Sequence, residues 1–394
     1  MIRCIRKPGI TGYIQSDDFF SLTVTLALGY THEARDQASF VHLLEHMLAE
    51  NGVIHGKSIR NLLFQHDIDV SANTFPFHTE ITLATDRQTA IVNRDLISDV
   101  IYLWQRPNIV SYGDRDLKLA ATSIREEVFA KRDSGAFATI PWSIAPSLYS
   151  RHCEPGHDGF NQISPILDPQ LSHKFCNFIE STKDVQTGVG IAGSEDLVEL
   201  FLPNIDRPAG SSDALQKIVI GRPSGTVEVT DSRLTSPVVC DVYKLPVVDC
   251  LQSAFLWCFM FDNLLGGITC QGNVWQIGTF GPLCGPDFNI MTHTYEAPLY
   301  CSVGKIFESL PSISELALTA LHAFSKYCAG VVSKSKIAAR SSLFGVDYLQ
   351  VGEKISDLVH NVQGQRRVGE ELNAMLECLR QPSNAGILWS PATR

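Results

Sequence analysis

One short segment, His42-Leu43-Leu44-Glu45-His46, constrains the fold of this chain more than any other feature. It lies inside a helix-type pattern that runs from Ser39 to Glu50. Residues three and four apart share one face of a helix, so His42, Glu45 and His46 would project together. Four apolar residues can pack the other faces against a core: Val41, Leu44, Met47 and Leu48. The pattern predicts a half-buried helix with three polar groups side by side.

Two imidazoles four residues apart on a helix can bind one zinc ion, and a neighbouring glutamate can act on the water that the metal activates. The spacing is H-x-x-E-H, the reverse of H-E-x-x-H. We therefore predict that His42 and His46 are zinc ligands and that Glu45 is the catalytic base. The alternative interpretation is an exposed polar helix face on which Glu45 and His46 are only solvated.

A catalytic zinc site needs a third protein ligand and one open position. The candidate is Glu127, within the helical pattern Ile124-Arg125-Glu126-Glu127-Val128. Its neighbour Glu126 cannot share the same helix face, so only one of the two can point toward the metal. Spacing alone does not exclude an ordinary surface glutamate at either position.

Composition excludes several other classes. The chain has 394 residues, enough for two or three domains with cores of their own. It has no apolar run of about 20 residues, so we expect no membrane-spanning helix. The formal net charge of −10, without a long basic run, argues against a nucleic-acid partner. No signal-peptide pattern opens the chain, and the 11 cysteines form no C-x-x-C pair, so we expect a cytoplasmic protein with reduced thiols.

Strand and helix patterns alternate in two successive halves. In the first half we expect, in order, a strand at 21–28, helices at 39–50 and 58–66, strands at 69–72 and 79–84, helices at 87–105 and 114–132, a strand at 188–193 and a helix at 194–201. In the second half we expect strands near 238–247 and 299–303, a helix at 251–265 and helices after 312. A Pro-, Gly- and Ser-rich stretch between the halves predicts a domain at 1–208, a linker at 209–215 and a domain at 216–394.

The segment Phe40–Leu48 resembles the metal motif of the M16 family, which includes pitrilysin, insulinase and the mitochondrial processing peptidases. The segments Val70–Thr74 and His78–Leu83 are similar to the strands that follow in that family, and Glu127 matches its third ligand. The resemblance implies an α+β fold with two related α/β sandwich domains, each a mixed or antiparallel sheet flanked by helices. It also implies a zinc site formed by His42, His46 and Glu127.

By the same resemblance, Glu45 passes a proton from water to the leaving amine, and Asn73 lies near a peptide that pairs as an extra strand. Two positions depart from the family. The assisting glutamate of the family falls on Ala120, and no arginine occurs between Arg233 and Arg340, where the family has an Arg and Tyr pair. Short chains of the family often work in pairs that divide these functions.

The resemblance therefore implies a short M16B-type subunit: a zinc-dependent endopeptidase that cleaves peptides or leader-bearing precursors. It would be the catalytic subunit of a heterodimer whose homologous partner supplies the Arg and Tyr. Two alternatives are a non-catalytic scaffold and a subunit that only binds peptides.

Overall fold

The protein is described by a computed structural model in which two compact units are distinguished, and each is described by itself. The described residues are 3–15, 18–134, 163–205, 225–231, 234–245, 251–266, 272–278, 281, 290–300, 312–345, 347–348, 353–357, 361–381 and 385–391. The expected linker, residues 209–215, lies outside them.

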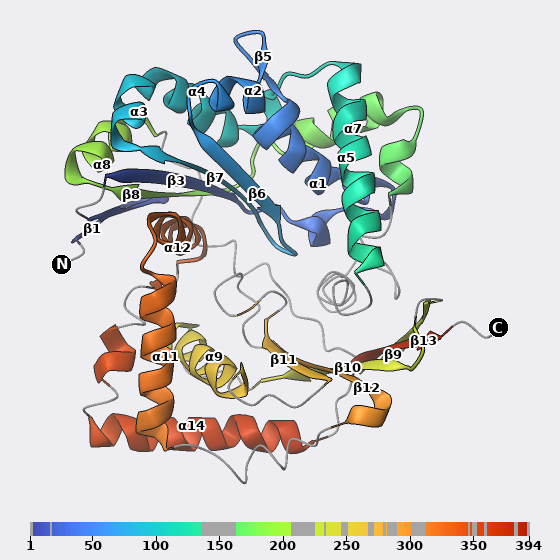
Figure 1. The fold of residues 1–394 in the computed structure, drawn as a ribbon, viewed down its shortest axis with the longest axis vertical. Helices are drawn as coiled ribbons and strands as arrows, with labels where there is room; N and C mark the ends of the chain where they lie inside the picture. Colours follow the sequence, from blue (N-terminus) through green and yellow to red (C-terminus); the bar gives the residue numbers. More distant parts are fainter. Residues whose placement is uncertain are drawn as a thin grey trace. The chain divides into compact units, whose positions relative to one another are not determined.

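Unit 1 is built on a six-stranded sheet in the order β1-β2-β8-β3-β7-β6 (Figure 1). The strands are β1 (Arg3–Lys7), β2 (Ile10–Ile14), β3 (Phe19–Leu26), β6 (Asp69–Thr74), β7 (Thr79–Asp86) and β8 (Thr187–Gly193). Neighbours run antiparallel except for β2 and β8, which are parallel. Because β6 is the last strand of the order, its outer backbone edge pairs with no other strand of this sheet.

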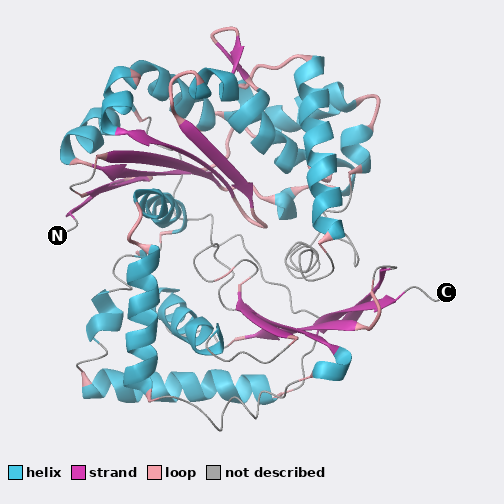
Figure 2. Ribbon diagram, in the orientation of Figure 1, coloured by secondary structure: helices cyan, strands magenta, loops and turns pink. Residues whose placement is uncertain are grey.

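Both faces of this sheet are buried, but they differ in chemistry. Along β3, Leu22 and Val24 point to one face and Ser21 and Thr23 to the other, and all four are buried. Helices cover the apolar face: α1 (Phe40–His46), α2 (Ile59–Phe64), α3 (Arg87–Val92), α4 (Arg94–Trp104), α5 (Asp114–Asp133), α7 (Leu171–Ser181) and α8 (Glu195–Phe201). A small hairpin of β4 (Val53–Ile54) and β5 (Lys57–Ser58) precedes α2. Figure 2 shows the layers.

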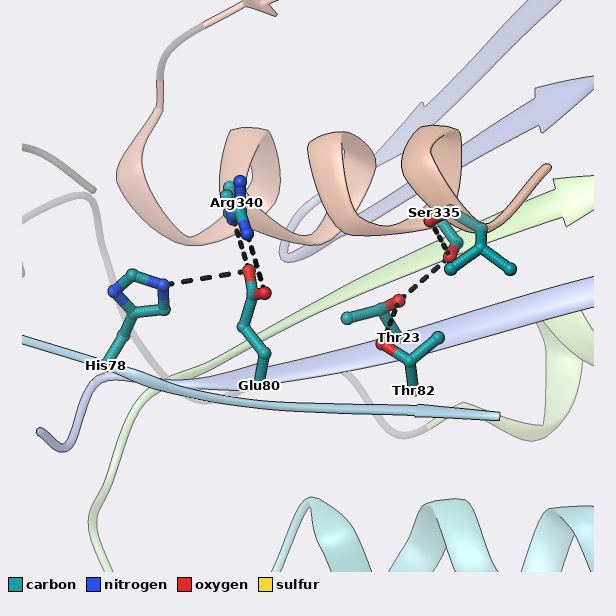
Figure 3. A network of polar contacts seen from close by, with 7 residues as sticks. Thr23, His78, Glu80, Thr82, Ser335 and Arg340 are labelled. Atoms are coloured by element: carbon teal, nitrogen blue, oxygen red, sulfur yellow. Dashed lines mark hydrogen bonds and ion pairs between the residues drawn. The ribbon is translucent and has the colours of Figure 1, made fainter. Parts of the chain in front are cut away.

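Among the described helices, α12 (Val331–Phe344) packs against the hydroxyl-rich face. It comes very close to β8 because Gly188 and Gly190 have no side chains; a Cβ at Gly190 would meet the carbonyl oxygen of Ser335 at 2.0 Å. The side chains of Thr23 and Ser335 lie 2.8 Å apart, and Arg340 pairs with Glu80 on β7 (Figure 3). These contacts place α12 in unit 1, whereas the expected boundaries had assigned residues 216–394 to a second domain.

Unit 2 has a five-stranded sheet in the order β11-β12-β10-β13-β9. Its elements are β9 (Gly225–Asp231), β10 (Val238–Lys244), α9 (Leu251–Gly266), β11 (Asn273–Ile277), β12 (Ile290–Glu296), α11 (Ile313–Tyr327), α14 (Val362–Arg380) and β13 (Ala385–Pro391). The strand expected at 299–303 is wrong at its start, because Leu299 ends a 3-10 turn that follows β12. Residues 301–303 lie outside the described part.

Each unit therefore combines a mixed sheet with flanking helices, and the predicted α+β class is confirmed. None of the helices in the described residues combines the length and the hydrophobicity that a membrane crossing requires.

Candidate metal centre

The N-terminus of α1 is held by a buried carboxylate rather than by a conventional cap. Ser39 occupies the cap position with a φ of 70°, but its side chain makes no capping hydrogen bond. Instead, the backbone N–H groups of Ser39 and Val41 donate to Glu33 at 2.9 and 2.7 Å. Burial raises the pKa of Glu33 to about 8, although these backbone donors lower it. On the other side, Phe40 packs edge-on against Phe178 of α7, so α1 is fixed at both its end and its flank.

The structure brings the three predicted ligand side chains together. His42 Nε2 lies 3.4 Å from Glu127 Oε2, and His46 Nε2 lies 3.2 Å from Glu127 Oε1. One ligand atom of each residue lies within 4.8 Å of the others. The two histidines come from consecutive turns of α1 and the glutamate from α5, so two helices are needed to form the cluster. Two imidazoles and one carboxylate are a donor set that suits zinc and leaves a coordination position open.

Electrostatics at this cluster favours positive charge. Burial alone would lower the pKa of His46, but Glu127, Glu50 and Glu45 outweigh it and raise the pKa to about 9. Burial likewise opposes ionisation of Glu127, yet contacts with His42 and His46 lower its pKa far below the usual range. Carboxylates that stabilise a proton on His46 would equally stabilise a metal cation in its place. The residues therefore fit a divalent cation by charge as well as by donor type.

The predicted base, Glu45, is buried and oriented by a neighbouring strand. Its Oε2 accepts a hydrogen bond of 2.6 Å from the hydroxyl of Thr74, at the end of β6. Glu45, His46 and Glu127 together line a pocket of about 400 Å³. Apolar side chains form much of its remaining wall: Ala49, Leu63, Phe64, Ile68 and Val70. The cluster thus opens onto a cavity that can receive a side chain beside the edge strand β6.

Other positions singled out in the sequence are placed as follows. Asn73 is exposed on β6 and does not line the pocket, so its substrate contact stays a prediction. Glu126 points to solvent and pairs with Arg125 at 2.8 Å, so Glu127 alone of the two faces the histidines. Ala120, two turns before Glu127 on α5, is fully buried and supplies no carboxylate.

Sequence reasoning missed Glu50, which lies next to His46, and Arg60, which contacts Glu50. Glu50 lies in a π-helical turn (Met47–Asn51) that continues α1, and its Oε2 is 3.5 Å from His46 Nδ1. Arg60 on α2 donates to Glu50 Oε1 at 3.0 Å. The i, i+4 spacing of His46 and Glu50 was visible in the sequence. The approach of Arg60 was not, because it depends on how α2 folds back.

Comparisons with known proteins bear on the fold. No family model matches the sequence, and neither does any curated protein. Solved structures do match over nearly the whole chain, at 10–12% identity.

Three structures illustrate the likeness. The inactive domain of a peptidase M16 from Pseudomonas fluorescens aligns with a TM-score of 0.64 and 10% identity, covering 100% of this chain and 98% of that one. The first half of the periplasmic protease PqqL from Escherichia coli gives 0.59 and 12%, covering 98% and 91%. A protease from Helicobacter pylori gives 0.57 and 12%, covering 99% and 100%. At such identities the likeness shows the fold alone, which is the fold of an M16 peptidase domain.

Proposed function

We propose that this protein is a zinc-dependent endopeptidase of the M16 type. The observation that carries the proposal is the convergence of His42, His46 and Glu127, with Glu45 on the same pocket as His46 and Glu127. Because the fold is also found in an inactive domain, the fold by itself does not decide between an enzyme and a scaffold. The intact donor set and the adjacent carboxylate favour the enzyme.

Each residue has a distinct part in this proposal. His42 and His46 would hold zinc through Nε2, and Glu127 through its carboxylate. When bound, zinc supplies a Lewis acid that polarises a peptide carbonyl and lowers the pKa of water. Thr74 holds Oε2 of Glu45, which leaves Oε1 to accept the proton of the attacking water and to deliver it to the leaving amine.

The substrate would bind as an additional strand. The sheet order leaves the outer edge of β6 unpaired within the sheet, and β6 borders the pocket with its residues Asp69–Ala72. An extended peptide can pair with such an edge through main-chain hydrogen bonds, while a side chain enters the adjacent pocket. This arrangement suits unfolded peptides or leader segments of precursors, and Asn73 would lie along the same strand.

Substitution of Glu45 tests the proposal. In Glu45→Gln, cleavage of a mixed set of unstructured peptides should fall by about 10² to 10⁴, because the proton acceptor is lost. Zinc content, measured by atomic emission, should stay at the wild-type level. Glu126→Gln, which changes the neighbouring exposed carboxylate, is the control and should keep full activity. Wild-type protein without zinc and without cleavage would support the scaffold instead.

We further propose that a homologous chain supplies an Arg and Tyr pair. The sequence has no arginine between Arg233 and Arg340, and Arg340 is already engaged in a buried pair with Glu80. The PqqL match is likewise half of a longer protease. Loss of an oxyanion donor typically lowers a rate by about 10² to 10³, so adding a partner that carries the pair should raise the rate by a comparable factor. A lone monomer whose rate the partner does not change would contradict this.

A further inference from the structure

The second ring nitrogen of His46 does not take part in the ligand cluster. Its Nε2 faces Glu127 at 3.2 Å, so its Nδ1 points away from the ligand cluster. Nδ1 is buried, and no described residue completes a hydrogen bond of ordinary geometry with it. An imidazole that binds a metal through Nε2 carries its proton on Nδ1, and that N–H normally donates to a carboxylate or carbonyl. A buried donor of this kind needs an acceptor.

Glu50 is the carboxylate that faces this nitrogen. Its Oε2 lies 3.5 Å from Nδ1, across one turn of helix. This separation is long for an N–H···O bond, but the side chain of Glu50 is 32% exposed and therefore has room to move closer to Nδ1. The carboxylate of Glu50 is therefore placed to accept a hydrogen bond from Nδ1–H.

The local backbone and a second side chain bring Glu50 to this position. After His46 the helix widens into the π-turn Met47–Asn51, which closes with a hydrogen bond of 2.7 Å from Gly52 N to Met47 O. π-helical turns are rare in proteins overall, but those that occur are often found at functional sites. Arg60 then binds the other oxygen, Oε1, at 3.0 Å. The two oxygens of Glu50 thus face two different partners, and Arg60 fixes the direction of the carboxylate.

We propose that Glu50 is a positioning residue for the metal centre: it accepts a hydrogen bond from the Nδ1–H of His46, and so fixes the tautomer and ring orientation in which Nε2 binds zinc. Arg60 acts one step further out by holding Glu50. The inference rests on the proposed zinc site, but it concerns residues that neither the motif nor the comparisons assign. A different role for Glu50, a surface ion pair with Arg60 alone, would contribute little and would leave metal binding unchanged.

The test is zinc affinity, measured by competition with a chromogenic chelator. Glu50→Ala should weaken zinc binding by about 10- to 100-fold, the usual cost of losing such a partner. Glu50→Gln should lie between the wild type and Glu50→Ala, because the amide oxygen still accepts the hydrogen bond from Nδ1–H but lacks the negative charge. Arg60→Gln should weaken binding less than Glu50→Ala. Glu126→Gln, an exposed carboxylate near the same site, is the matched control and should bind zinc as the wild type does.

Cobalt provides a readout that general loss of structure would not reproduce. The visible absorption of the Co²⁺-loaded protein should change in intensity or position in Glu50→Ala and stay unchanged in Glu126→Gln. Circular dichroism of the metal-free variants checks that each one folds. If Glu50→Ala binds zinc as tightly as the wild type and gives the same cobalt spectrum, the inference is overturned while the zinc site stands. If the wild type binds no zinc, the proposed function itself fails.

Discussion

Helices α1 and α12 lie on opposite sides of the sheet of unit 1 (Figure 1), and the charged clusters to which they contribute are balanced in different ways. On the α12 side, Glu80 and Arg340 are 1% and 3% exposed and neutralise each other. On the α1 side, carboxylates gather around His42 and His46, and the raised pKa of His46 and the positions of the donors favour an added cation. The first cluster is complete once the chain has folded. The second has the charge and the donors of a site made for an ion.

The two clusters should also contribute to the stability of the fold in different ways. Burying an ion pair costs desolvation free energy for both partners. The effect that can be measured most clearly is therefore the loss of stability when one partner is removed. A metal centre stabilises the fold only when the ion is present, in proportion to its concentration over Kd. The two clusters should therefore respond to different perturbations.

The largest effect is expected on the α1 side. His46→Ala removes one of three ligands, so peptide cleavage should drop to background and the protein should lose stoichiometric zinc. Measurement of zinc per chain, together with cleavage of a quenched fluorescent peptide, checks both. Glu80→Gln should retain its zinc under conditions in which it stays folded; if it loses zinc as His46→Ala does, the two clusters are not independent.

On the α12 side, the largest change should follow from breaking the buried pair. Glu80→Gln removes the negative charge that pairs with the buried guanidinium of Arg340, which should cost about 3–5 kcal/mol of unfolding free energy. Urea unfolding of the chelator-treated protein measures the loss. Glu195→Gln, which breaks an exposed pair with Arg3, is the control and should cost far less. Equal losses in the two variants would contradict the role given to burial.

The two sides should also lose stability in opposite pH ranges. Burial opposes ionisation of Glu80, but Arg340 outweighs it and lowers the pKa to about 2, so the carboxylate stabilises the fold above its ordinary pKa of 4.5. That contribution, on the order of 3 kcal/mol, is lost as the pH falls from 4.5 toward 2. In the chelated protein, His46 has a raised pKa of about 9, so its contribution is present below 6.5 and is lost as the pH rises through 9.

Stability curves over pH test this opposition. Glu80→Gln should flatten the acid limb and leave the alkaline limb in place. His46→Ala should flatten the alkaline limb in metal-free protein. If Glu80→Gln and the wild type lose the same unfolding free energy between pH 4.5 and 2, Glu80 is not the source of the loss of stability in acid.

The smallest effect is expected when both partners of the buried pair are replaced. Glu80→Leu combined with Arg340→Met removes both charges and fills similar volumes, so its stability should lie within about 2 kcal/mol of the wild type. A double-mutant cycle from urea unfolding measures the coupling between the two sites. If the double variant is as unstable as the sum of the single changes, the pair is not the interaction that holds α12 here.

The sequence was sufficient for features that depend on local periodicity. The spacing of His42, Glu45 and His46 predicted a shared helix face, and the strand pattern at 79–84 predicted what is β7, from Thr79 to Asp86. The α+β class followed from the alternation of elements. The single helix expected at 87–105 is two, α3 and α4, which meet at Asn93. Local sequence patterns therefore predicted whether these elements are helices or strands better than they predicted where each element begins and ends.

Features that depend on distant parts of the chain were out of reach. Arg340 is 260 residues from Glu80 in sequence, and nothing near either residue indicates the pairing. Gly188 and Gly190 read as ordinary strand glycines until α12 is seen against them. Likewise, the contact of Arg60 with Glu50 depends on the path of the chain through α2. Long-range packing, not local propensity, decides these contacts.

We propose that the α1 cluster binds a metal ion, whereas the Glu80–Arg340 pair on the α12 side is complete without one. The most direct measurement is the zinc stoichiometry and affinity of purified wild-type protein, with unfolding followed at increasing zinc. We predict one zinc per chain, and stabilisation by about 2.7 kcal/mol at a free zinc concentration 100 times Kd, in wild-type and Glu80→Gln protein alike. No bound zinc and no stabilisation in the wild type would contradict the account.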